Sequence, residues 1–297
     1  MIMNTHLSHP VIKDITEHMS ALTPKGRILG DYIIQNPRKA VFMTTKELAE
    51  ACGVSEATVV RFVGKLGYAG YGDFLQALRD FVDTGLSLPD RVDLPGIKGA
   101  GTNCLHRVLV EEINNLQHLY ESTDVEAIAL FVEKLASSHS VYVIGSRLSY
   151  TFAYYLGWSL TKVRKGVHIL KGSDSTAIDC LSNAPDGALV IIIATSRYPN
   201  ELIKLARVSR RFHQTLLVIT DSKLCPLIQF ADRTLIAPSR SIPLIGYSAA
   251  ISSIINCLIL ELAGRNDVAM KHHQERLEQA YLENDILFNP HSHDPRP

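Results

Sequence analysis

Apolar residues recur at helical spacing through the first part of the chain, although residues 1–20 are polar and show no clear period. A helix is expected to begin near Thr23-Pro24, because threonine caps helices and proline suits the first turn. Its apolar face consists of Ile28, Leu29, Tyr32 and Ile33. Pro37 is expected to end this helix, a short helix follows over 40–43, and a last one runs to about Val82. The pattern predicts an all-helical N-terminal region.

Within this region, residues 45–64 read as two short helices around a tight turn. Gly53 can adopt the left-handed backbone that ends the first helix. Ser55 occupies an N-cap position, and Glu56 lies in the first turn, near the positive end of the helix dipole. The residues expected to face inward are Ala49, Val54, Val59 and Phe62. This arrangement predicts a helix-turn-helix whose second helix enters the DNA major groove.

The outward positions of that second helix are the candidate DNA contacts Ser55, Glu56, Thr58, Arg61 and Lys65. Arg61 can bind guanine or phosphate, while Ser55 and Thr58 can reach phosphates or base edges. The alternative is an ordinary helical hairpin. The net charge is zero, and residues 22–80 hold eight Lys/Arg against six Asp/Glu, so DNA binding should depend strongly on salt and require a dimer.

After a glycine- and proline-rich stretch at 84–101, helical patterns return at about 103–120 and 124–137, and then the period changes. Short apolar runs alternate with helical segments, and a closing helix follows over 246–263. The runs are 141–145, 167–170, 188–194, 216–220 and 233–237. This alternation predicts an α/β domain with a mainly parallel sheet flanked by helices. The expected organisation is a helical domain at 1–83, a linker at 84–101 and an α/β domain at 102–297.

Two loops that follow predicted strands carry the second candidate site. Each loop combines hydroxyl groups with one arginine, Arg147 in the first and Arg197 in the second. Ligands of open α/β sheets bind at the carboxyl ends of strands, where helix N-termini attract anions and guanidinium groups match phosphate or carboxylate. Alternatively, the serines cap helices and the arginines pair with surface carboxylates. The candidate effector-binding residues are Gly145, Ser146, Arg147, Ser149, Thr195, Ser196 and Arg197.

Composition and short motifs bear on disulfides, membrane insertion, metal binding and cofactor binding. The five cysteines are scattered and form no CxxC pair, which favours free thiols in a reducing cytoplasm. The N-terminus lacks a signal-peptide pattern, and the most apolar run, 247–260, is short for a membrane span. The histidine pairs at 272–273 and 291/293 lack metal-ligand spacing, and no GxGxxG fingerprint occurs. We therefore expect no metal and no cofactor.

With these features, the chain resembles a known family, the RpiR-type bacterial transcription regulators. The most telling residues are Ser55-Glu-Ala-Thr-Val-Val-Arg-Phe62 and Lys65-Leu-Gly-Tyr68, while the region 103–264 is similar to a sugar isomerase (SIS) domain. The resemblance implies that the SIS domain binds a phosphosugar or related sugar metabolite, and that this binding changes DNA affinity in a dimer or tetramer.

The chain departs from the family pattern in both loops. The family's first loop usually reads Gly-x-Gly-x-Ser, whereas Arg147 stands at the second glycine here. The second loop usually reads Ser-x-Ser-Gly-x-Thr, of which only Ser196 is retained, with Arg197 at the glycine. Two outcomes stay open, because the arginines either bind an altered anionic effector or fill the pocket.

The sequence thus favours a cytoplasmic, non-enzymatic bacterial DNA-binding regulator. It would be a homodimer or homotetramer without membrane contact, bind an operator in double-stranded DNA, and sense a small anionic metabolite such as a sugar phosphate. One alternative is an aldose–ketose phosphate isomerase, for which the nearest bases are Glu201 and His168. Another is a DNA-binding protein whose sensor domain is vestigial.

Overall fold

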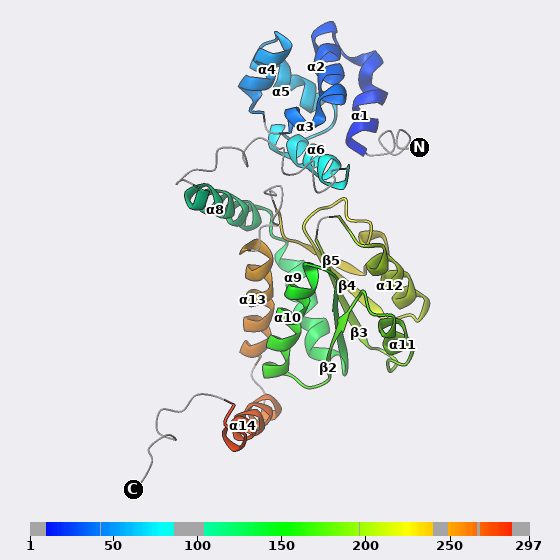
Figure 1. The fold of residues 1–297 in the computed structure, drawn as a ribbon, viewed down its shortest axis with the longest axis vertical. Coiled ribbons are helices and arrows are strands. Elements are labelled where there is room, and N and C mark those ends of the chain that lie inside the picture. The colour runs from blue at the N-terminus through cyan, green and yellow to red at the C-terminus, as the bar shows by residue number, and fades with distance from the viewer. Residues whose placement is uncertain are drawn as a thin grey trace. The chain divides into compact units, whose positions relative to one another are not determined.

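The computed structural model describes residues 10–41, 43–85, 104–195, 197–239, 249–265 and 268–286. The chain separates into two compact units, and the boundary falls after Asn115, inside helix α8 (Cys104–Ser122). Figure 1 shows a helical first unit and a second unit built around a sheet.

The described part of the first unit is all helical, as the sequence predicts, and one apolar cluster fills its centre. Thr23 caps its second helix by accepting a hydrogen bond from the Gly26 N–H at 3.2 Å, as expected. In the core, Phe62 and Phe74 meet edge to face with ring centroids 6.1 Å apart. The elements are α1 (Pro10–His18), the 3₁₀ turn η2 (Met19–Ala21), α2 (Pro24–Gln35), α3 (Pro37–Ala40), α4 (Thr45–Cys52), α5 (Glu56–Lys65) and α6 (Tyr71–Gly85).

The structure corrects the expectation for the start of the chain. Within the segment that shows no clear period, Pro10–His18 forms α1, because Val11, Ile12 and Ile15 lie on one face and are buried in the core. Three apolar residues make too narrow a stripe to stand out in a polar segment. Pro37 likewise begins α3 rather than only ending α2, since proline suits a first helical turn, and the short helix lies at 37–40 instead of 40–43.

The second unit holds a five-stranded sheet of order β2-β1-β3-β4-β5 in which all pairs are parallel. The predicted strands match closely because fully buried parallel strands are continuous apolar runs. The strands are β1 (Val141–Gly145), β2 (Val167–Lys171), β3 (Leu189–Ala194), β4 (Thr215–Thr220) and β5 (Arg233–Ile236).

Helices cover both faces of this sheet (Figure 1). Alternate residues of β1 face opposite sides, so Val143 joins the cluster under α9, α10 and α13, and Ile144 joins the one under α11 and α12. The helices of this unit are α9 (Val125–Ser137), α10 (Ser149–Val163), α11 (Thr176–Ser182), α12 (Asn200–Arg211), α13 (Ala249–Gly264) and α14 (Val268–Glu283), and a 3₁₀ turn, η3 (Ile228–Phe230), precedes β5.

The strand order places the two arginine-bearing loops together. From β1 the chain moves outward to β2, whereas β3, β4 and β5 extend on the other side of β1. Gly145 pairs in register with Ile193, so the loops that leave β1 and β3 start side by side. A point where strand order reverses is the usual ligand crevice of an open α/β sheet.

Two predicted segments fall partly outside the described residues. The linker expected at 84–101 is one, because residues 86–103 are not described. The closing helix expected at 246–263 is the other: α13 begins at Ala249, and 246–248 lie outside the description.

Candidate functional sites

The turn of the helix-turn-helix forms as its residue types require. Gly53 adopts the left-handed conformation (φ 62°, ψ 36°) at the end of α4, which is accessible to glycine without strain. The Val54 N–H then donates to the Ala49 carbonyl at 2.9 Å, a bond that closes the turn. At the other end of α4, Thr44 and Glu47 form a reciprocal capping box. The turn therefore holds α4 and α5 in a fixed relation.

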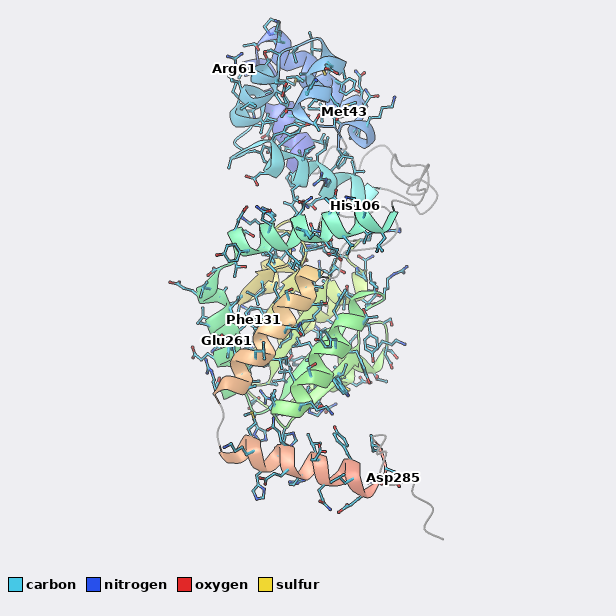
Figure 2. All side chains as sticks on the ribbon, turned by 90° about the vertical axis from the view of Figure 1, so that its left-hand side faces the viewer. Met43, Arg61, His106, Phe131, Glu261 and Asp285 are labelled. Atoms are coloured by element: carbon cyan, nitrogen blue, oxygen red, sulfur yellow. The ribbon has the colours of Figure 1, made fainter. Side chains whose placement is uncertain are left out.

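Helix α5 buries one face and exposes the other. Val59, Phe62 and Val63 are buried in the core of the helical unit, so the inward face is largely as predicted. Arg61 and Lys65 are exposed, and Figure 2 shows Arg61 at the surface of this unit. Cationic side chains on the exposed side of the second helix of a helix-turn-helix can attract the phosphates of a DNA duplex.

The first turn of α5 differs from the expectation in detail. Ser55 occupies the N-cap position but makes no capping bond to the backbone; its hydroxyl pairs with the Thr58 hydroxyl at 2.9 Å, and Thr58 is half-buried. The Glu56 carboxylate accepts a hydrogen bond from the Thr45 hydroxyl at 3.0 Å. This bond links the first turns of α4 and α5 and gives Glu56 a local structural partner.

Val60 is an exposed residue of α5 that is not among the DNA contacts predicted from the sequence. Val60 is 57% exposed, and it lies on the same open side as Arg61. Gly64, one turn further on, has open space where a side chain would stand. The spacing from the buried Val59 and Val63 is the signal that places Val60 outward. Apolar side chains at such positions contact thymine methyl groups in the major groove.

In the second unit, Ser149 connects the two predicted effector loops. Its side chain is buried, pairs with the Thr195 hydroxyl at 2.9 Å, and accepts a hydrogen bond from the Thr195 N–H at 3.0 Å. Thr195 follows β3 and Ser149 begins α10, so these bonds tie the loop after β3 to the loop after β1.

Ser146 makes a contact that the sequence did not predict. Its hydroxyl donates to Glu201 Oε1 at 2.7 Å, and the serine is only 1% exposed. The hydrogen bond from Ser146, together with the Glu201 N–H and the nearby Arg147 and Lys204, holds the pKa of Glu201 below its usual value. Glu201 therefore belongs to the same group of side chains, and its position in the first turn of α12 was the available signal.

Both arginines of the loops adopt the left-handed backbone, with φ of 54° at Arg147 and 58° at Arg197. These are the positions where the resemblance expects glycine, so the loops keep a glycine-type conformation with a charged residue in it. Both side chains are exposed, and neither forms an ion pair with a carboxylate of the described residues. Ser196, the remaining candidate, lies outside the described residues.

Gly145 has a packing role at this site. A Cβ atom on Gly145 would lie 2.4 Å from the Ser149 carbonyl oxygen and 2.8 Å from Ala153 Cβ. The Gly145 carbonyl also accepts a hydrogen bond from the Gly172 N–H at 2.7 Å. Glycine therefore lets α10 approach the end of β1 closely, which brings Ser149 to Thr195.

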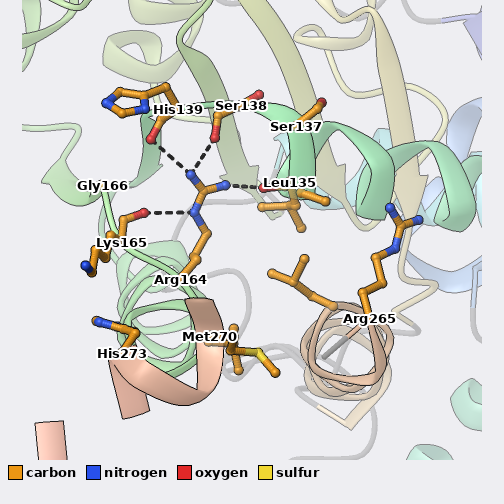
Figure 3. A pocket seen from close by; sticks show the side chains of 13 residues that line it. Leu135, Ser137, Ser138, His139, Arg164, Lys165, Gly166, Arg265, Met270 and His273 are labelled. Carbon is orange, nitrogen blue, oxygen red and sulfur yellow. Dashed lines mark hydrogen bonds between the residues drawn. The ribbon is translucent and has the colours of Figure 1, made fainter. Parts of the chain in front are cut away.

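A cavity of about 690 Å³ lies elsewhere in this unit, near the amino ends of β1 and β2 (Figure 3). Arg164 points into it, but its guanidinium donates to the carbonyls of Leu135, Ser138, His139 and Lys165. Arg164 thereby satisfies carbonyls at and just beyond the end of α9. None of the predicted effector residues lines this cavity.

The described ranges also bear on metal binding, cysteine pairing and membrane insertion. Within them, no three His, Cys, Asp or Glu side chains gather in a way that suits a metal ion. Cys52, Cys180, Cys225 and Cys257 are free thiols. Among the same residues, none of the helices has the length and apolar character needed to span a bilayer.

Comparison with known proteins agrees with this architecture. The helix-turn-helix domain of the rpiR family matches residues 10–84, and the SIS domain matches residues 134–263. The HTH-type transcriptional regulator HexR of Pseudomonas aeruginosa is 22% identical, over 92% of this chain and 95% of its own. The uncharacterised HTH-type transcriptional regulator YbbH of Bacillus subtilis is 24% identical, over 81% of this chain and 84% of its own.

Two solved structures share the fold. The NanR protein of Vibrio vulnificus, complexed with ManNAc-6P, has a TM-score of 0.57 and 21% identity, and the match covers 92% of this chain and 98% of NanR. The sugar isomerase domain of an RpiR transcription factor from Sphaerobacter thermophilus has a TM-score of 0.57 and 23% identity, over 60% of this chain and 99% of that domain. With its N-terminal helix-turn-helix and C-terminal SIS domain, the chain belongs to the RpiR-type family of bacterial transcriptional regulators.

Proposed function

We propose that α5 reads the operator mainly through Arg61 and Lys65, which are exposed and cationic. The Ser55–Thr58 hydroxyl pair at the start of α5 is suited to a phosphate contact. Glu56 has a smaller role in this proposal than the sequence suggests, since it binds Thr45 and would repel the DNA backbone.

The test of this interface is the DNA affinity of Arg61→Ala, measured on an operator selected from random duplexes with the purified protein. Loss of a base contact should weaken binding by about 1–3 kcal/mol, whereas Lys13→Ala removes the same charge from the exposed end of an α1 ion pair and should change little. Equal affinities of Arg61→Ala and the unaltered protein would contradict this assignment of α5.

The same chain senses a small anionic metabolite at the meeting point of the loops that follow β1 and β3. The observation that carries this proposal is the exposed Arg147–Arg197 pair at the reversal of strand order. Gly145, Ser146, Ser149 and Thr195 form the framework beneath the pair, and Ser196 stays a predicted contact. A sugar phosphate suits such a site because guanidinium groups bind phosphate in two-pronged fashion.

The double variant Arg147→Ala/Arg197→Ala tests the sensor. We expect it to bind operator DNA normally but to lose the change in affinity that a panel of sugar phosphates causes in the unaltered protein. Arg211→Ala, at the far end of α12, is the control for loss of one exposed arginine outside the site. Collapse of DNA binding in the double variant would instead assign the arginines a structural role.

We propose a regulator without catalytic turnover. An isomerase needs a base beside the substrate carbonyl. Glu201 is a weakened base because the Ser146 hydroxyl lowers its pKa, and His168 stacks on Tyr142 along β2, away from the carboxyl edge of the sheet. Turnover of any sugar phosphate that disappears in Glu201→Gln would favour the isomerase.

In this proposal the protein acts in the cytoplasm as a homodimer or homotetramer, with domains at 1–83 and 102–297 joined by the segment 84–101. The two helix-turn-helix domains of a dimer must match the spacing of the two DNA half-sites, so a small rotation caused by the effector alters the DNA affinity. A coupling free energy of about 1–3 kcal/mol gives roughly five- to 150-fold regulation. Leu260 of α13, 71% exposed, offers apolar surface for self-association. Light scattering of the purified chain tests the assembly.

A further inference from the structure

Two residues at the start of α12, Pro199 and Glu201, make this helix end less favourable for an anion. Pro199 at the N-cap position has no N–H to donate. The Glu201 N–H, one of the free donors of the first helical turn, contributes to lowering the pKa of the Glu201 carboxyl. The same carboxylate accepts the Ser146 hydroxyl at 2.7 Å. A phosphate that approached this helix end would meet the Glu201 carboxylate and a serine hydroxyl that is already bonded to it.

Ser146 has only one proton to give, and it gives that proton to a carboxylate. A phosphate oxygen at hydrogen-bond distance from the buried Ser146 would stand within a few ångströms of the Glu201 charge, and like charges at that separation repel each other. The position beside Ser146 is therefore unfavourable for the anionic end of a ligand.

Exposed positive charges accompany this carboxylate. Arg147 and Lys204 lie near enough to Glu201 to stabilise its charged form, and the Arg147 and Arg197 side chains are exposed. The site thus combines two exposed arginines with a partly exposed carboxylate that feels the charge of Arg147. Glu201 is partly exposed and has acceptor capacity beyond its hydrogen bond with Ser146, since a carboxylate offers about four lone pairs.

We propose, building on the function proposed above, that Glu201 is the specificity-determining residue of the effector site. The ligand places its anionic group against Arg147 and Arg197 and turns a hydrogen-bond donor, preferentially an ammonium group, toward Glu201. The ligand class is an anionic sugar derivative that also carries an amino group. A ligand that offers only anionic groups meets repulsion from Glu201.

Calorimetric titration of the full chain with glucosamine 6-phosphate and glucose 6-phosphate tests this assignment, because the two probes differ in one amino group. We expect the unaltered protein to bind the amino sugar at least tenfold more tightly. Glu201→Gln, which keeps the shape and removes the charge, should reduce this ratio to about one, chiefly through tighter binding of glucose 6-phosphate.

Two further variants keep the result interpretable. Glu133→Gln removes the same charge from the exposed side of α9 and should behave like the unaltered protein. Glu201→Asp keeps the charge and should retain a preference for the amino sugar. The fluorescence of Trp158 in α10, the only tryptophan of the chain, verifies that each variant has a folded α/β unit.

The outcomes separate this inference from the proposed function. An affinity ratio that is the same in Glu201→Gln and in the unaltered protein overturns the role of Glu201 and leaves the sugar-phosphate sensor intact. Absence of binding by both probes, in every variant, overturns the sensor proposal and this inference with it.

Discussion

Replacement of Arg147 by glycine should stabilise the α/β unit, whereas replacement by alanine should not. At φ 54°, Arg147 has a conformation that costs a residue with a side chain about 1–2 kcal/mol and costs glycine nothing. Alanine keeps the Cβ atom and therefore keeps this cost. Both variants lose the same charge, so the difference between their free energies of unfolding isolates the backbone term.

The expected size of that difference follows from two opposing contributions. Relief of the left-handed strain stabilises the glycine variant by about 1–2 kcal/mol relative to the alanine variant. The greater conformational freedom of glycine in the unfolded chain reduces this advantage by about 0.4–1 kcal/mol. The glycine variant should therefore exceed the alanine variant by about 0.5–1 kcal/mol. The same reasoning applies to Arg197, whose φ is 58°.

Urea unfolding followed by Trp158 fluorescence measures this difference. Trp158 lies in α10, so its signal reports on the α/β unit. Glu133 in α9 provides the backbone control, because glycine inside a helix is less stable than alanine by about 0.5–1 kcal/mol and the order of the two variants should reverse. Equal stability of Arg147→Gly and Arg147→Ala would refute the view that arginine stands in a glycine-type position.

Three further outcomes can be measured directly. Val60→Ala should weaken operator binding by about 1 kcal/mol, and exchange of thymine for uracil in the operator should reduce the affinity of the unaltered protein but not that of the variant. Thr23→Ala should cost the helical unit about 1 kcal/mol in urea unfolding followed by circular dichroism, whereas Ser55→Ala should cost much less, because Thr23 caps a backbone N–H and Ser55 does not. The pKa of Glu201 is lowered in the folded protein, chiefly by Ser146, so its contribution to stability is complete above the unfolded value of about 4.5 and is lost as pH falls through the folded pKa. The stability difference between the unaltered protein and Glu201→Gln should thus be constant near neutral pH and shrink below about pH 4.5, and a constant difference down to pH 3 would contradict this reasoning.

Much of the fold follows from local patterns. The run 141–145 matches β1 because a strand buried on both faces requires a continuous apolar segment, and Gly145 marks where α10 must approach. Gly53 predicts the turn of the helix-turn-helix because few other residues adopt its left-handed backbone. In these places one residue type satisfies a single local requirement, so the sequence alone suffices.

The features that the sequence did not predict depend on contacts between residues that are far apart in the chain. Ser146 and Glu201 are separated by 55 positions, and their pairing appears only once β1 and β3 are adjacent. The N-terminal helix α1 is stabilised by burial against the other helices rather than by its own pattern, and its Asp14 accepts a hydrogen bond from Tyr68, 54 positions away. The spacing of residues within one segment does not predict such distant partners.

The two left-handed arginines bear on whether the sensor is active or vestigial. A degenerate site has no reason to keep a strained backbone, because that cost must be offset elsewhere in the fold. Here Arg147 and Arg197 both retain it while their side chains extend to solvent, and Ser149 still ties their loops together. Both loops thus hold a strained backbone whose side chains are exposed cations. A site that only filled space would bury those side chains, so the arrangement favours an active sensor with altered ligand chemistry.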